Sequence, residues 1–84
     1  MARFWIDGLP VAVVSDPLGA PEQLRIHGHT YLVTTVVLRW RIRQRWWRTP
    51  IWREYFVVTA RGPLLLRLYH DLPHGGWYVE FLYD

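Results

Sequence analysis

The stretch "YLVTTVVLRWRIRQRWW", residues 31–47, decides the fold. Val, Thr, Ile and Trp dominate it, and these residues favour strands. Arg occupies every odd position from 39 to 45, whereas a helix would scatter these side chains around its circumference. This period of two predicts one long strand, and the length of the run predicts a bulge or bend within it.

The two faces of this strand differ in composition, because alternate residues of a strand point to opposite sides. One face is nearly all apolar and is the expected core face: Leu32, Thr34, Val36, Leu38, Trp40, Ile42, Gln44 and Trp46. The other face is apolar early and pure arginine later: Tyr31, Val33, Thr35, Val37, Arg39, Arg41, Arg43 and Arg45.

Turn signals divide the rest of the chain into shorter strands. Asp7-Gly8 between two apolar runs predicts a hairpin, and residues 15–22, with two Pro and one Gly, predict a loop. Gly28-His29 predicts a second hairpin turn. Further turns are expected at residues 48–50, 61–63 and 71–76. The best place for a single helical turn is residues 21–24.

These elements predict an all-β fold, a strongly curved antiparallel meander or small barrel of about six or seven strands with little or no helix. The length of 84 residues predicts a single β domain over residues 1–84. It would comprise an N-terminal hairpin and loop (1–22) and a meander (23–84). The expected core aromatics are Trp5, Trp40, Trp77, Phe56 and Phe81, and the expected interface aromatics are Tyr69, Tyr78 and Trp47.

The composition restricts the class of protein. Cysteine is absent, which excludes disulfides and thiolate metal sites. The start of the chain has no signal-peptide pattern, and no uncharged run is long enough to span a bilayer, so we expect a cytoplasmic protein without membrane contact. All ten basic residues are Arg, and the depletion of thermolabile residues suits a thermophilic bacterium.

The positive charge is concentrated in one segment. Residues 39–53 hold six of the ten Arg and no acidic residue, whereas the rest of the chain holds four Arg and all seven acidic residues. Arg binds phosphate bidentately, and Trp offers a surface on which unpaired bases stack. The candidate nucleic-acid-binding residues are Arg39, Arg41, Arg43, Arg45, Arg48, Trp47 and Arg53. The alternatives are a solvated face paired with Glu54, Glu80 or Asp84 across strands, or an acidic protein partner.

No pattern of residues indicates catalysis. Glu54 and Glu80 lie mid-strand, where acids opposite Arg form ion pairs, and the chain has no Gly-rich phosphate loop or nucleophile elbow. Four turn histidines could hold a metal only if their two turns met in space: His27, His29, His70 and His74. We therefore expect a non-enzymatic protein without metal or cofactor. Its partner would be DNA or RNA, a second copy of the chain, or another protein.

A pattern of short aromatic motifs runs through the second half of the chain: Trp46-Trp47, Arg53-Glu54-Tyr55-Phe56, Gly62, Asp71 and Trp77-Tyr78. In this pattern the chain resembles a small bacterial domain family of unknown function, and also the C-terminal tail of Y-family-polymerase-like mutagenesis accessory proteins. The resemblance to the first family extends to Gly28, Val33, Val37, Trp40 and the final Tyr83-Asp84. The resemblance covers roughly residues 24–84 and implies a small β domain tied to DNA repair, with no catalytic residues.

Overall fold

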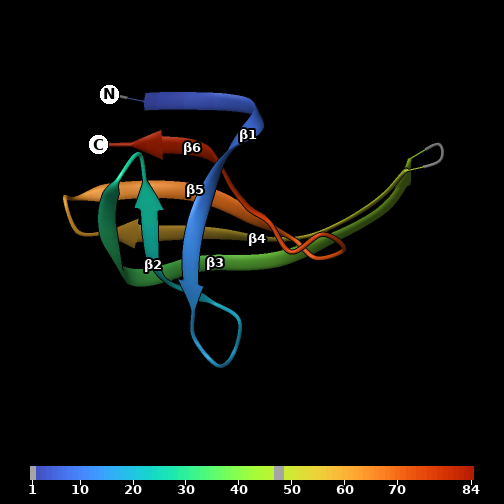
Figure 1. The fold of residues 1–84 in the computed structure, drawn as a ribbon, viewed down its shortest axis with the longest axis horizontal. Coiled ribbons are helices and arrows are strands. Elements are labelled where there is room, and N and C mark those ends of the chain that lie inside the picture. The colour runs from blue at the N-terminus through green and yellow to red at the C-terminus, as the bar shows by residue number, and fades with distance from the viewer. Residues whose placement is uncertain (1, 47–48) are drawn as a thin grey trace.

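The computed structural model describes residues 2–46 and 49–84 and contains six antiparallel strands closed into a barrel (Figure 1). Each strand pairs with the next along the chain, and β1 also pairs with β6 to close the ring. The described residues form no helix, so the all-β prediction is confirmed. They accordingly include no helix that is long and apolar enough to cross a membrane. The strands are β1 (Ala2–Ser15), β2 (Pro21–Ile26), β3 (His29–Trp46), β4 (Thr49–Ala60), β5 (Leu64–Asp71) and β6 (Trp77–Tyr83).

The core fills the barrel from alternate residues of β4 and β5, with contributions from β2 and β6. The largest fully buried side chains are Phe56, Leu24, Leu66, Leu68, Val58 and Val79. Trp5 and Trp77 pack against this cluster. The core prediction is therefore confirmed for Phe56, Trp5 and Trp77.

Three aromatic predictions need correction. Phe81 pairs in register with the exposed Arg67 and contacts Phe4 on the outer face, because the register shifts by one residue between β5 and β6. Trp40 also lies on the outer face, stacked on Tyr55. Tyr69, expected at an interface, is only 5% exposed. Trp47 lies outside the described residues.

The predicted hairpin at Asp7-Gly8 is wrong. β1 continues through both residues as one bent strand (Figure 1). Between Phe4↔Phe81 and Leu9↔Val79, β1 advances five residues while β6 advances two, so β1 bulges here, and Gly8 within the bulge adopts a φ of 80°. A positive φ suits Gly in a bulge as well as in a hairpin turn. The Asp7-Gly8 sequence is therefore compatible with both a hairpin turn and a bulge, and the pairing of β1 with the distant β6 selects the bulge.

The assignment of the core face of β3 is also wrong. Leu32 and Leu38 on the expected core face are 46% and 57% exposed, whereas Tyr31 and Val33 of the other face pack against the core. The first half of β3 is apolar on both faces, so only the arginines of the second half distinguish a polar face from an apolar one. The arginines can share the inner face because Arg39 and Arg41 bond the buried Glu54, whereas Arg43 and Arg45 lie where β3 and β4 extend beyond the barrel. The expected irregularity in β3 is confirmed by two register shifts against β4.

The turns match the sequence more closely. His27 and Gly28 have φ values of 49° and 83°, one residue earlier than predicted, and join β2 to β3. Positive φ at both positions is typical of a tight hairpin turn. Turns also follow β1, β4 and β5 as expected. The predicted helical turn at residues 21–24 is wrong, because these residues begin β2. The predicted turn at residues 48–50 is wrong at Thr49 and Pro50, which begin β4, and Arg48 lies outside the described residues.

Candidate nucleic-acid interface

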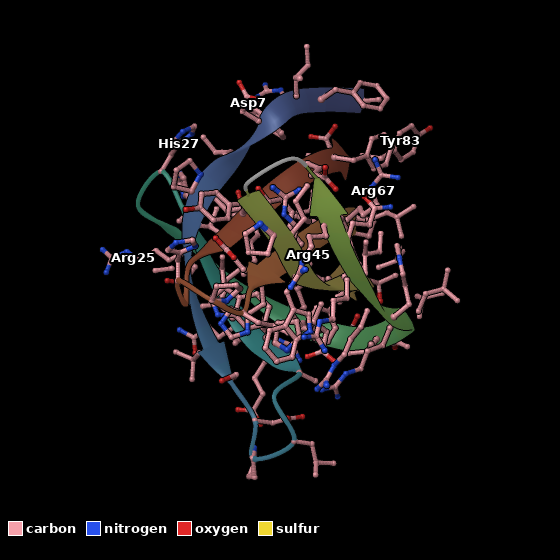
Figure 2. All side chains as sticks on the ribbon, turned by 90° about the vertical axis from the view of Figure 1, so that its right-hand side faces the viewer. Asp7, Arg25, His27, Arg45, Arg67 and Tyr83 are labelled. Carbon is pink, nitrogen blue, oxygen red and sulfur yellow. The ribbon has the colours of Figure 1, made fainter. Side chains whose placement is uncertain are left out.

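The hairpin of β3 and β4 extends beyond the barrel as a two-stranded arm, residues 43–46 and 49–52 (Figure 1). β5 pairs with β4 only from Arg53 onward, so the arm has no third strand among the described residues. Arg43 pairs in register with Trp52, and Arg45 pairs with Pro50. In Figure 2, which views the molecule from the end of the arm, Arg45 lies at the centre. Arg43 and Arg45 therefore lie on the part of the sheet that extends beyond the third strand.

Arg39 and Arg41, nearer the barrel, are occupied by one buried carboxylate. Glu54 accepts two hydrogen bonds from Arg39, with Nε 2.9 Å from Oε2 and Nη2 3.3 Å from Oε1. Arg41 adds a third from its Nε, at 3.2 Å. Arg39 also donates to the Leu18 backbone oxygen and lies 5.1 Å above the Phe56 ring. The predicted cross-strand pairing with Glu54 is confirmed, and Arg39 closes one end of the core.

These bonds control the ionisation of Glu54, whose side chain is 7% exposed. Burial alone would raise its pKa, but the hydrogen bonds from Arg39 and Arg41 and their positive charge outweigh burial and hold the pKa below its ordinary value. A carboxyl with a lowered pKa in the folded state stabilises the fold above its unfolded-state pKa of about 4.3. That contribution is lost as the pH falls through the folded-state pKa.

We expect Glu54→Gln to destabilise the protein at neutral pH by about 1–3 kcal/mol, because Arg39 and Arg41 lose a charged acceptor. The difference between wild type and variant should shrink as the pH falls well below about 4.3, where Glu54 becomes protonated. Urea unfolding between neutral and acidic pH measures both values. Glu80→Gln is the control, because the Arg67–Glu80 pair is looser at 3.6 Å. A difference that stays constant with pH would contradict this role of Glu54.

Arg43 and Arg45, in contrast, form no ion pair within the described part of the chain. They line a groove of about 310 Å³ with Gln44, Pro50, Trp52 and Pro73. The Arg43 guanidinium lies 5.3 Å from the Trp52 ring centre. The Leu72 amide donates to the Trp52 carbonyl oxygen, which fixes the β5–β6 turn and its Pro73 against the arm. The groove is thus cationic and partly aromatic, and no acid lines it.

Arg53 lies on the opposite face of β4. Its guanidinium is 4.2 Å from the Tyr69 ring centre and donates to the Tyr55 hydroxyl at 3.3 Å. Four aromatic side chains continue this outer row across four strands: Trp40, Tyr55, Tyr69 and Tyr78. Trp40 stacks on Tyr55 and Tyr69 stacks on Tyr78, whereas the Tyr55 and Tyr69 rings meet at a tilt. Arg53 is therefore separated from Arg43 and Arg45.

The remaining sequence candidates do not join this groove. Trp47 and Arg48 lie outside the described residues. His27 and His29 line a pocket with Leu64 at one end of β5, whereas His70, stacked on Trp77, occupies the other end. His74 bonds Asp71 at 2.9 Å. The two histidine turns therefore do not meet, and the described residues contain no cluster that could hold a metal ion.

The role of Pro73 could not be read from the sequence, because the β5–β6 turn meets the arm only after the barrel closes. The pairing of some arginines with Glu54 could be anticipated, since Glu54 directly follows the basic segment. Comparisons with protein-family models, curated proteins and solved structures found no match to this chain.

Proposed function

We propose that this protein is a small non-enzymatic binding module that holds nucleic acid in the groove beside the β3–β4 arm. Arg43 and Arg45 contact phosphates, and Trp52 supplies a stacking surface. Arg41, which is 60% exposed despite its bond to Glu54, borders the same face and adds positive potential. Arg48 belongs to the same basic segment of the sequence, residues 39–53. The resemblance of the second half to mutagenesis accessory proteins favours a role in DNA repair.

The observation that carries this proposal is the division of the arginine row. Arg39 and Arg41 share the carboxylate of Glu54, whereas Arg43 and Arg45 project beside Trp52 with no acid among the groove residues. Unpaired guanidiniums favour a polyanion, because Arg donates two parallel hydrogen bonds to phosphate. The groove volume of about 310 Å³ lies at the lower end of the range for ligand pockets.

The double variant Arg43→Glu/Arg45→Glu tests the proposal. We expect it to weaken binding to labelled single-stranded DNA or RNA by at least about 100-fold, because each of the two charge-assisted contacts contributes about 1.5–3 kcal/mol. The slope of log affinity against log salt should fall by about 1.4, since each phosphate contact to a single strand contributes about 0.7. Fluorescence anisotropy across a salt series measures both quantities.

The matched control is Arg25→Glu/Arg61→Glu, which changes the net charge equally. Both residues are exposed and lie away from the arm, Arg25 on β2 and Arg61 in the β4–β5 turn. Figure 2 shows Arg25 at the border of the barrel, apart from Arg45. If the control weakens binding as much as the arm variant, the interaction depends on net charge and the groove assignment is wrong.

A second candidate function is a protein-interaction module. The observation in its favour is a set of exposed apolar side chains on the outer face, including Phe4, Ile6 and Leu38. Exposed apolar surface of this kind marks interaction sites. Nucleic-acid binding that is absent even at low salt would leave this candidate as the better account.

A further inference from the structure

The first half of β1 leaves one edge without a partner among the described residues. Ala2, Arg3 and Phe4 pair with β6, whereas β2 pairs with β1 only from Ala12 onward. In Figure 1 this half of β1 forms the upper border of the sheet, and Figure 2 shows Asp7 on that border. An unpaired edge exposes backbone donors and acceptors that can pair with another strand.

The side chains on this segment are unusually apolar for an exposed edge. Ile6 is 96% exposed and Phe4 is 71% exposed, while Trp5 packs against the core from the other face. Proteins commonly protect an open edge with several charged residues or a proline. Here the only charged residues of the segment, Arg3 and Asp7, flank three apolar ones.

The order of these five residues is self-complementary. In an antiparallel pair of two copies centred on Trp5, Arg3 of each copy lies opposite Asp7 of the other. Phe4 lies opposite Ile6, and Trp5 lies opposite Trp5. Opposite charges and apolar pairs facing each other across strands stabilise such a ladder. Asp7 forms no ion pair with another side chain in the described part of the chain. Arg3 lies near the Asp84 carboxylate, with which it interacts electrostatically, so pairing with Asp7 of a second copy would add to that contact or replace it.

We propose that two copies of this chain pair antiparallel through residues 3–7 of β1 and form a twofold-symmetric dimer. The interface is isologous, so each contact occurs twice. The outer face extends it, because Phe4 lines an apolar pocket of about 270 Å³ with Val57, Leu65 and Phe81. Ile6 of the second copy lies beside this pocket. The dimer is independent of the proposed nucleic-acid binding, because its residues lie outside the arginine groove.

Charge exchange tests the pairing and its register together. Sedimentation velocity, from micromolar to near-millimolar protein, should show a wild-type dimer. Arg3→Asp alone, or Asp7→Arg alone, places like charges opposite each other at two symmetry-related positions. We expect either change to weaken dimerisation on the order of 10- to 100-fold. The double variant Arg3→Asp/Asp7→Arg restores opposite charges and should restore the dimer.

Because the chain has no cysteine, introduced thiols give a second readout. In the presence of oxidised glutathione, a mixture of Phe4→Cys and Ile6→Cys proteins should form a disulfide between the two proteins. This disulfide should form faster than the disulfide-linked dimer of either protein alone, since only the mixture places thiols directly opposite each other. A wild type that is monomeric at all concentrations, or a dimer that the double variant does not rescue, would overturn the proposal. Circular dichroism confirms that each variant is folded.

Discussion

Phe56→Ala should remove about 3–5 kcal/mol of folding free energy, the largest effect that we expect of a single substitution. The Phe56 side chain is fully buried, 5.5 Å from the Trp77 ring centre and 5.1 Å below the Arg39 guanidinium. Its loss opens a cavity in the core and removes the surface on which Arg39 rests. Since domains gain about 0.05–0.15 kcal/mol per residue, a chain of this length retains little stability after such a loss.

Val57→Ala is the matched control, because Val57 is the next residue of β4 and faces outward, where it lines the pocket beside Phe4. We expect it to cost less than about 1.5 kcal/mol, since its surroundings are solvated. Urea unfolding followed by tryptophan fluorescence gives both values. Equal losses for the two variants would mean that the two faces of β4 are wrongly assigned.

Gly8→Ala should cost about 2–5 kcal/mol, because two penalties combine. The φ of 80° is unfavourable for any residue with a Cβ, by about 1–2 kcal/mol. A Cβ at Gly8 would also lie 2.8 Å from the Tyr78 Cβ and 3.1 Å from the Tyr69 hydroxyl. Relieving that overlap in a packed site costs about 1–3 kcal/mol more.

Gly28→Ala separates the two penalties. Its φ of 83° is nearly the same, but no atom lies within 4 Å of an added Cβ. This variant should therefore lose only the backbone term, about 1–2 kcal/mol. Chemical denaturation of both proteins measures the difference. If Gly28→Ala were as costly as Gly8→Ala, the close approach of β1 to Tyr69 and Tyr78 would be contradicted.

Features of the fold that depend on neighbours in sequence could be predicted. The turn near Gly28 and the long third strand follow from residue types that act within a few positions. The bend at Gly8 could not be predicted, because a hairpin and a bulge require the same positive φ. Only the pairing of β1 with β6, at opposite ends of the chain, selects the bulge. The barrel therefore has six strands, the lower of the two predicted numbers, because β1 is one strand where a hairpin was expected.

The candidate site divides in the same way. The period of two in the arginine row predicts that Arg39, Arg41, Arg43 and Arg45 share one face, and the register with β4 confirms it. The direction of that face could not be predicted, because it depends on which strands fill the barrel. Glu54 allows Arg39 to turn inward, since a buried carboxylate compensates its charge. The contribution of Pro73 depends on the closed barrel.

The most direct test of the central claim is an NMR titration of ¹⁵N-labelled protein with a short single-stranded oligonucleotide. We predict that the Arg43 and Arg45 side-chain Nε–H resonances and the Trp52 indole N–H shift together and saturate. The Arg39 Nε–H, already bound to Glu54, should move little. Shifts confined to Arg25, Arg61 and other exposed arginines, or no shift at low salt, would contradict the assignment of the groove as a nucleic-acid site.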